Sequence, residues 1–336
     1  MTMPTAEVSA VRSANWCGCI PVVVNLAPTS LSSPTMPPPL HRMVSRMSYL
    51  HLGLADEVKR LYKFAPATLS FGFKRGGESG SLLTGSAPRD ENISKGDGEH
   101  SAGESDDSNR TTSPNIIADT AKYPVCWFED ESSGMALRWH MFAGVLYDIM
   151  KDRKKSSEAL PWRLRVHFTS YPTHQILSFA NGNVPQTLEH MFNNSLKQAL
   201  FLQHGSSKVA MGLSKASHQK LWDAIVGSHY ALYEEINGDG LQSCGSKHNG
   251  GENIQYVPVR VMVDNKPALQ RPCTVFVEET NSVKRTIGDL LADWLPDKLG
   301  GETSLVNNKD VSVSVQGISL SLSIPILDVW KCLCHP

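Results

Sequence analysis

From Gln186 to Ile236 the sequence has the pattern of helices and no pattern of strands, although strand patterns occur on both sides of it. Apolar residues in this run recur at the spacing of one helix face, as in Leu188, Phe192 and Leu196. A segment with this period does not fit a sheet, because side chains on a strand repeat every second residue. The sequence therefore predicts a helical unit between two units that contain strands.

The segment before the helical run has the order hairpin, helix and strand, which is the order of a ubiquitin-like β-grasp unit. Ile20 to Leu26 is short and β-branched, which predicts an earlier strand. The strings CWFED and ALRWH, separated by Ser and Gly, predict the hairpin. The strict alternation of Arg163 to Thr169 predicts the last strand. The helix between them is expected to bury an apolar stripe made of Phe142, Val145, Leu146 and Ile149.

A second unit with a similar order follows a Gly-, Ser- and Asn-rich linker at Gly238 to Gly251. The alternation of Val257 to Val263 predicts one strand, and the apolar run Thr274 to Val277 predicts another. In the next helix, Thr286 is the expected N-cap, with Asp289 as its acidic partner three residues later.

The end of this second unit is predicted from three further signals. VSVSV at Val311 to Val315 alternates as a strand does, Gly317 turns the chain, and Pro325 opens a last helix that continues through Trp330. We expect residues 252–336 to form this second ubiquitin-like unit without the last strand that completes a β-grasp sheet.

An acidic insertion is expected inside the first unit. Arg75 to Thr120 is rich in Gly, Ser, Asp and Glu, has no aromatic residue, and shows no period that would bury a face. The sequence thus predicts a disordered spacer here. The first unit then spans residues 14–180, and the helix-rich unit spans residues 186–237. The predicted fold class is α+β.

Composition excludes several classes of function. The 32 basic and 33 acidic residues leave a net charge of -1, which provides no global field for nucleic acid. No apolar run approaches the roughly 18 residues that span a bilayer, so membrane contact is expected to be peripheral. The seven scattered cysteines and the lack of a signal peptide favour reduced thiols in the cytoplasm. His140 and His167 sit beside core positions and are expected to be structural.

Lys197 is the candidate functional residue of the helical run, inside FNNSLKQA at Phe192 to Ala199. It lies about 100° around the helix from Leu196, beside the buried stripe. A lysine in this position can lay its methylenes on apolar surface and keep its amine in water. No carboxylate occurs from Met191 to His204, which removes the local ion pairs that would hold the amine protonated. The alternative interpretation is an ordinary solvated lysine.

Several strings in all three units together resemble the autophagy protein 5 family. The first unit contributes CWFED, ALRWH, GVLYDIM and LPWRLRVHFTSYP, the helical run contributes FNNSLKQA and HQKLW, and the second unit contributes YVPVRV and TIGDLL. Their order holds from about Trp16 to the end of the chain, apart from the insertion. The resemblance implies two ubiquitin-like β-grasp domains that flank a helix-rich domain.

The resemblance also implies a non-catalytic function in autophagosome assembly. Members of the family accept the ubiquitin-like autophagy protein 12 through an isopeptide bond to one lysine, and the matching position here is Lys197. The E2-like autophagy protein 10 is the implied donor, and autophagy protein 16 is expected to bind as a helix in a groove. The conjugate is expected to act as an E3-like stimulator of the E2-like autophagy protein 3, which transfers autophagy protein 8 to phosphatidylethanolamine. The implied location is the cytoplasm with recruitment to the phagophore membrane, and no cofactor is implied.

Two other interpretations stay open at this level. The chain can be a binding module that assembles the same partners non-covalently. It can also be a metal or thiol enzyme that uses Cys17, Cys19, Cys332 and Cys334, with His335 beside them. The C-x-C spacing is shorter than the usual two to four residues between zinc ligands, which disfavours the metal site. No Gly-rich phosphate loop or G-x-S-x-G elbow is found.

Overall fold

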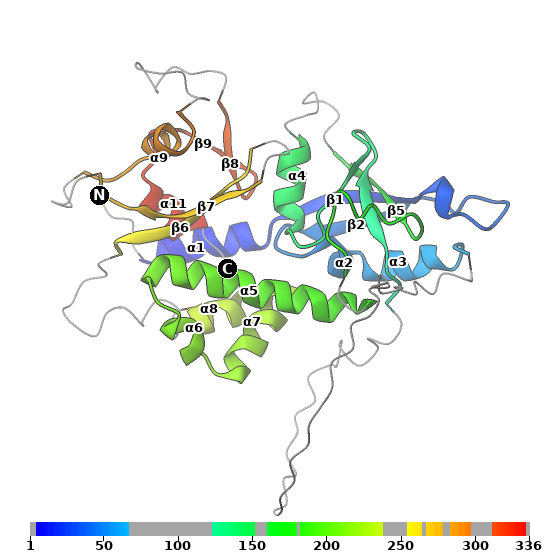
Figure 1. Ribbon diagram of the computed structural model, residues 1–336, viewed down its shortest axis with the longest axis horizontal. Coiled ribbons are helices and arrows are strands. Elements are labelled where there is room, and N and C mark those ends of the chain that lie inside the picture. The colour runs from blue at the N-terminus through cyan, green and yellow to red at the C-terminus, as the bar shows by residue number, and fades with distance from the viewer. Residues whose placement is uncertain are drawn as a thin grey trace, which may run out of the picture.

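The computed structural model describes residues 5–66, 123–151, 160–179, 182–237, 254–263, 267–277, 283–296 and 311–333. The predicted insertion at 75–120 and the whole linker at 238–251 lie outside these residues. Figure 1 shows two strand-containing units beside a layer formed by the long helix α5 and the shorter helices after it. The sequence prediction of a helical unit between two units with strands is confirmed.

In its described residues, the first unit contains five strands and four α-helices. Its elements in chain order are α1 (Thr5–Trp16), β1 (Cys19–Leu26), the 3-10 turn η1 (Pro28–Ser30), β2 (Leu40–Ser45), α2 (Leu50–Gly53), α3 (Ala55–Tyr62), β3 (Trp127–Asp130), β4 (Met135–Ala136), α4 (Ala143–Lys151) and β5 (Trp162–His167). The strands form one sheet in the order β2-β1-β5-β3-β4. Strand β1 runs parallel to β5 and antiparallel to β2, and it pairs Val24 with Leu164.

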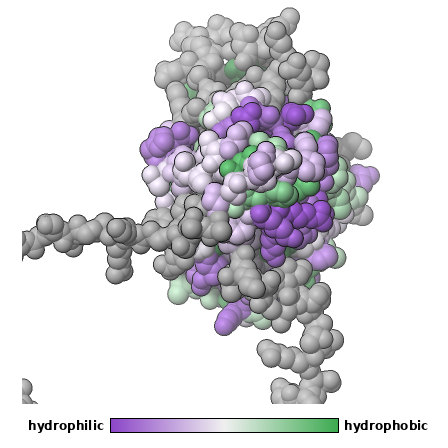
Figure 2. Space-filling model, turned by 90° about the vertical axis from the view of Figure 1, so that its right-hand side faces the viewer, coloured by the Kyte–Doolittle hydropathy of each residue, from purple (hydrophilic) through white to green (hydrophobic). Residues whose placement is uncertain are grey.

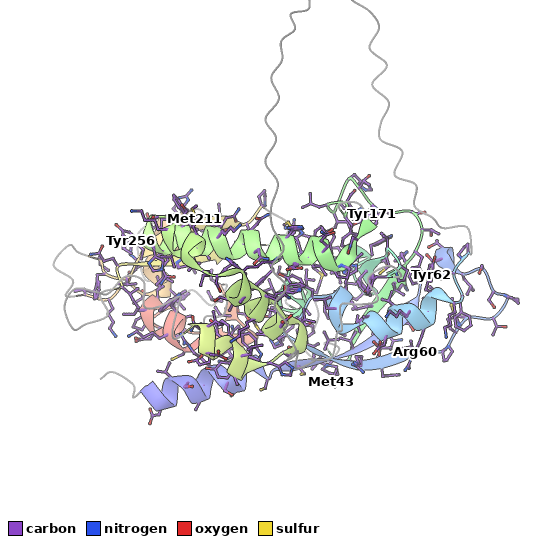
Figure 3. All side chains as sticks on the ribbon, turned by 90° about the horizontal axis from the view of Figure 1, so that it is seen from below. Met43, Arg60, Tyr62, Tyr171, Met211 and Tyr256 are labelled. Atoms are coloured by element: carbon purple, nitrogen blue, oxygen red, sulfur yellow. The ribbon has the colours of Figure 1, made fainter. Side chains whose placement is uncertain are left out.

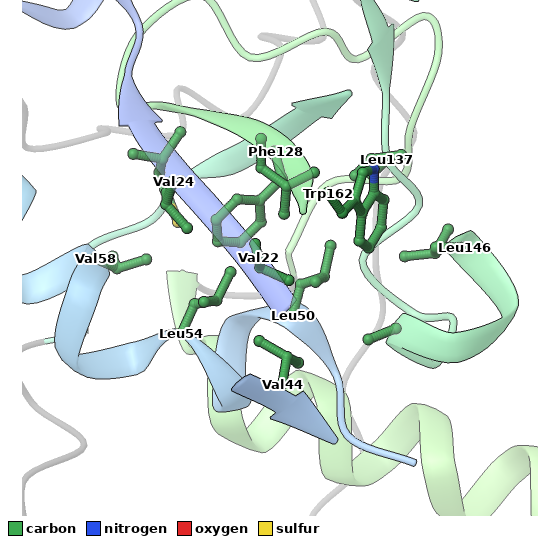
Figure 4. Packing of buried hydrophobic residues seen from close by; sticks show 14 of the residues in the cluster. Val22, Val24, Val44, Leu50, Leu54, Val58, Phe128, Leu137, Leu146 and Trp162 are labelled. Atoms are coloured by element: carbon green, nitrogen blue, oxygen red, sulfur yellow. The ribbon is translucent and has the colours of Figure 1, made fainter. Parts of the chain in front are cut away.

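The core of this unit lies between the sheet and the helices α2, α3 and α4. Figure 4 shows Val22 and Val24 of β1 and Phe128 of β3 among the apolar side chains of α2 and α3. Alternation in β5 is confirmed, because Leu164 and Val166 are fully buried. The predicted stripe of α4 is wrong in part: Leu146 is buried, but Phe142, Val145 and Ile149 are only partly buried, whereas Ala143, Gly144, Tyr147 and Met150 are buried. The helix is rotated because Gly144 approaches the backbone of Arg46, to which its N–H donates (2.9 Å).

The surface of the first unit has a hydrophobic area as well as hydrophilic areas. Figure 2 views the molecule from the end that carries this unit and shows a hydrophobic area bordered by hydrophilic side chains. Large apolar side chains exposed on the unit include Met43 of β2 and Tyr62 of α3. None of the helices in the described ranges is long and apolar enough to cross a membrane.

The helical run forms α5 (Val184–His204), α6 (Lys208–Gly212), α7 (Lys215–Gly227) and α8 (Tyr230–Ile236). Its hydrophobic cluster is shared with the first unit, because Met47, Tyr49 and Trp139 pack into it. Tyr49 lies 6.3 Å from Trp222 of α7 between ring centroids. The two units therefore meet through a continuous apolar interior.

The second strand-containing unit comprises β6 (Tyr256–Val261), β7 (Leu269–Thr274), α9 (Ile287–Trp294), β8 (Val313–Val315), β9 (Ile318–Leu320) and α11 (Ile326–Leu333). The predicted capping box of α9 is confirmed, because the side chains of Thr286 and Asp289 each accept from the other's backbone N–H. The predicted strand at 274–277 is wrong: β7 ends at Thr274 and pairs Pro272 with Pro258 of β6. The sequence pattern did not predict this strand because it contains Pro272, and a proline, which cannot donate a hydrogen bond to the ladder, usually indicates the end of a strand.

Helix α1 was not predicted, and it joins the first part of the chain to the last. Trp16 at its end is fully buried and stacks on Tyr233 of α8, with ring centroids 4.8 Å apart. Arg12 donates from Nε to the backbone carbonyl of Lys331 in α11 (2.6 Å) and lies 3.9 Å from the carboxylate of Glu234. The helix contacts elements more than two hundred residues away, so local periodicity did not reveal it.

The turn of the β8–β9 hairpin rests on the first unit. Gln316 and Gly317 both have positive φ values, 52° and 82°, as a two-residue hairpin turn requires. A Cβ added to Gly317 would lie 2.7 to 2.9 Å from the guanidinium atoms of Arg46. That guanidinium is fixed by Asp148 (2.5 Å) and by the carbonyl of Gly144 (3.3 Å). Arg46 therefore links the first sheet, α4 and the second unit.

We expect Gly317→Ala to lower the free energy of unfolding by about 2–3 kcal/mol, because it adds backbone strain and a clash with a fixed guanidinium. Gly134→Ala is the matched control, since Gly134 also has a positive φ (68°) but nothing lies within 4 Å of its added Cβ. The control should lose about 1 kcal/mol. Urea unfolding of both variants measures the difference, and equal losses would contradict the proposed contact between the two units.

Candidate conjugation site

The candidate site is built on α5, a long helix whose ends are both capped. The backbone N–H of Gln186 donates to the side-chain oxygen of Asn183 (3.1 Å), and Pro185 occupies the first turn, where a missing N–H costs nothing. At the other end Gly205 adopts a left-handed conformation with φ 63°, and its N–H donates to the carbonyl of Phe201 (2.8 Å). These caps define the helix on which Lys197 is carried.

The buried face of α5 is close to the predicted stripe. Leu188, Phe192 and Leu196 are buried as expected. The helical spacing would continue the row at Ala199 and Gln203, but these are only partly buried, and Leu200 completes it instead. Phe192 lies 5.7 Å from Trp222 of α7 between ring centroids. Strand β6 of the second unit also contacts α5. The helix is thus packed against its own bundle and against the second unit.

Lys197 is exposed on the face of α5 that turns away from this packing. In the described ranges, no ion pair or hydrogen bond joins its amine to another side chain. Asn194 and Phe201 are exposed three residues before and four residues after it, which places all three on one helix face. The arrangement presents a primary amine to solvent on a packed helix.

Phe201 is a residue that sequence reasoning missed. Its side chain is 52% exposed, although a phenylalanine in a bundle helix is normally buried. The spacing of four residues from Lys197 was available in the sequence and places both on one face. Figure 3 shows two further exposed apolar residues, Met211 of α6 and Tyr256 of β6, toward the end of the molecule at which α5 finishes.

The described part of the structure gives little support to the interpretation of the chain as a thiol or metal enzyme. Cys17 and Cys19 are exposed where α1 passes into β1, Cys332 lies in α11, and Cys334 and His335 lie outside the described residues. Although α1 packs on α11, no three His, Cys, Asp or Glu side chains in the described ranges lie close enough to hold a metal ion. Burial raises the pKa of Cys332, which opposes formation of a reactive thiolate.

The two histidines that were expected to be structural differ. His167 stacks on Trp127 with centroids 3.8 Å apart, and its Nε2 lies 3.2 Å from a carboxylate oxygen of Glu129. His140 is only partly buried, and its Nδ1 is enclosed without a hydrogen-bond partner in the described part of the chain. His167 therefore fits the structural expectation, and His140 does not fit it fully.

The architecture defines a protein class made of two ubiquitin-like domains that flank a helical bundle. Three family models match the chain in this order: "Autophagy protein ATG5, UblA domain" at residues 15–70 and 108–168, "Autophagy protein ATG5, alpha-helical bundle region" at 185–239, and "Autophagy protein ATG5, UblB domain" at 256–336. The chain belongs to the autophagy protein 5 family, which gives it a role in autophagy.

Relatives and a solved structure agree with this assignment. The chain is similar to autophagy protein 5 of Phaeosphaeria nodorum, with 31% identity over 61% of this chain and 73% of the relative. It is 35% identical to autophagy protein 5 of Aspergillus fumigatus over 66% of this chain and 76% of the relative. The crystal structure of Kluyveromyces marxianus Atg5 has the same fold, with a TM-score of 0.63 at 20% identity over 96% of this chain and 94% of that chain.

Proposed function

We propose that this chain is a non-catalytic acceptor in autophagosome formation and that Lys197 takes autophagy protein 12 in an isopeptide bond. The observation that carries the proposal is the exposed amine of Lys197 on a helix that is packed against both neighbouring units. Members of the family accept the modifier on the matching lysine. A packed helix restricts the position of the amine, which lowers the entropy cost of reaching a thioester.

The reaction consumes Lys197 and needs no catalytic group from this chain. The deprotonated amine attacks the thioester carbonyl at the C-terminus of the modifier, so an N–C bond forms, the C–S bond breaks and the thiolate of the E2-like donor leaves. The proton that the nitrogen then loses passes to this thiolate or to water. The ammonium proton of Lys197 must be lost before the attack. In the described residues, no carboxylate lies within ion-pair distance of this amine, which leaves it accessible to the thioester.

The rest of the proposed function concerns partners. Autophagy protein 10 would deliver the modifier, and a helix of autophagy protein 16 would bind in a groove of the body formed by the three units. The conjugate would promote transfer of autophagy protein 8 by autophagy protein 3 onto phosphatidylethanolamine, with peripheral association at the phagophore membrane. The contacts of α5 with β6 and of α1 with α11 support one body as the scaffold.

Lys197→Arg should abolish the conjugate. The endogenous protein should show a slower band on a denaturing gel in the wild type and only the free band in the variant, because arginine has no amine that forms the isopeptide. The matched control is Lys215→Arg, which changes another exposed lysine of the same bundle and should leave the slower band unchanged. A slower band that persists in Lys197→Arg would reject Lys197 as the acceptor.

The same gel separates the alternative of a non-covalent binding module. In that case the partner co-purifies with the native protein but dissociates on denaturation, and no slower band forms in the wild type. Elemental analysis of the purified full chain for zinc tests the metal interpretation.

A further inference from the structure

An open pocket lies in the first unit, away from the candidate conjugation helix in the chain. Its volume is about 310 Å³, and it is lined by Arg138, His140, Thr173, His174, Gln175, Ile176 and Leu177. These residues come from two connections, one between β4 and α4 and one after β5. The lining contains an arginine, two histidines and a threonine but no carboxylate.

Two hydrogen bonds give the pocket a defined wall. Trp139 donates from Nε1 and Tyr171 donates from its hydroxyl to the same carbonyl oxygen, that of Leu177, both at 2.6 Å. Trp139 is buried and stacks on Phe179, with centroids 4.6 Å apart. These two hydrogen bonds therefore hold the wall formed by residues 173–177 against the buried side chain of Trp139.

In the part of the chain that the structure describes, the positive charge at the pocket has no paired counter-charge. No carboxylate in the described ranges lies within ion-pair distance of Arg138, which is partly buried. The charge of Arg260 of β6, which does not line the pocket, also acts on His140. The Nε and Nη2 of Arg260 both donate to the neutral side chain of Gln270 (2.9 and 2.6 Å). Two arginine charges, one from each of two units, therefore act on His140, and no carboxylate in the described ranges forms an ion pair with either arginine.

The pKa of His140 reflects the positive charge around the pocket. Burial lowers the pKa of His140, and the charges of Arg138 and Arg260 lower it further. Its Nδ1 is enclosed without a partner in the described part of the chain, so the imidazole keeps an unused hydrogen-bonding position. An uncompensated, partly desolvated cationic site is the environment that attracts an anion.

We propose that this pocket binds a phosphate monoester, with Arg138 as the principal contact and the His140 and His174 rings beside it. A dianion pairs with Arg138 and also offsets the charge of Arg260 that acts on His140, whereas a carboxylate carries one negative charge only. The guanidinium fork matches phosphate oxygens in a bidentate way. The volume exceeds that of a bare phosphate and admits a small organic group, in the lower range of ligand pockets. The phosphate belongs to a soluble ester or to a lipid headgroup.

Two binding measurements on the full chain distinguish these sources. Calorimetric titration with glycerol 3-phosphate probes the soluble ester. Flotation with phosphatidylcholine vesicles, with and without phosphatidic acid, probes the same monoester in a membrane. Binding in the first arm alone identifies a soluble ligand, and phosphatidic acid-dependent flotation identifies a lipid headgroup.

Arg138→Gln should weaken the binding about tenfold or more, because it removes a charge-assisted hydrogen bond. Thr173→Glu, at an exposed lining position, should weaken the binding to a similar extent, because it adds a negative charge to the pocket. This second variant tests the proposal if Arg138→Gln folds poorly. Arg60→Gln is the matched control, since Arg60 is exposed on α3 and Figure 3 shows it apart from Tyr171 at the pocket wall.

Lack of binding in both arms overturns the proposal, as does equal binding by the wild type and the two pocket variants. A loss in Arg60→Gln as large as in Arg138→Gln would also overturn it, because it would indicate a general charge effect. Lys197→Arg should bind phosphate as the wild type does, so the outcome here is independent of conjugation.

Discussion

Asp130→Ala should lower the free energy of unfolding by about 3 kcal/mol or more, because it leaves buried donors without an acceptor. Asp130 is fully buried at the end of β3. Its carboxylate accepts from Trp162 Nε1 (2.8 Å), from the backbone N–H of Ser133 (2.9 Å) and from the hydroxyls of Ser132 and Ser133 (2.5 and 2.8 Å). The carboxylate of Asp130 therefore holds both the hairpin turn at Ser132 and Ser133 and the fully buried indole of Trp162. Urea unfolding followed by tryptophan fluorescence measures the loss.

Glu131→Ala is the matched control for this prediction. Glu131 is the next acid in the chain, but its carboxylate pairs with Arg163 and Arg165 on the outer face of the sheet. Exposed ion pairs contribute about 1 kcal/mol or less, so the control should lose much less stability. Similar losses in the two variants would contradict the role assigned to the buried acceptor.

Acidification from pH 6.5 toward pH 4 should destabilise the first unit through His51. Burial lowers the pKa of His51 to about 4 from its ordinary 6.5, and only a hydrogen bond to the Cys126 carbonyl (3.1 Å) opposes this. Between these two pH values the unfolded chain binds a proton that the folded chain excludes, so the free energy of unfolding falls as the pH falls. The shift corresponds to about 3 kcal/mol in total.

The measurement is the free energy of unfolding at several pH values between 7 and 4 for the wild type, His51→Gln and His174→Gln. The slope of the free energy of unfolding against pH should be smaller in His51→Gln, because this variant lacks the titrating imidazole. His174→Gln, at an exposed position, should keep the slope of the wild type. An unchanged slope in His51→Gln would show that other groups cause the acid sensitivity.

Local patterns predicted most of the elements whose sequence signal is contained within one element. The alternation of β5, the capping box at Thr286 and the stripe of α5 each depend on neighbours within a few residues. The first two are confirmed, and the stripe is confirmed at Leu188, Phe192 and Leu196. The α+β fold class is confirmed for the same reason, because the order of such elements is read directly along the chain.

The errors have physical causes that lie outside single elements. The buried face of α4 is set by the close approach of Gly144 to Arg46, which lies about a hundred residues earlier in the chain. Strand β7 contains Pro272, which pairs with Pro258 of β6. Both strands are edges of a two-stranded sheet, where proline is tolerated because its missing N–H can face away from the partner strand. Helix α1 is held by long-range contacts from Arg12 and Trp16.

The sequence by itself determined the helical unit between two strand-containing units and the position of Lys197 beside a buried stripe, because helix and strand periods are local properties. Only the tertiary structure decided which strands pair, since the parallel pairing of β1 with β5 joins residues far apart in the chain. It also decided that the side chain of Phe201 is exposed and that the charges of Arg138 and Arg260 act on His140. Exposure and uncompensated charge depend on every element packed nearby, and no single segment of sequence contains that information.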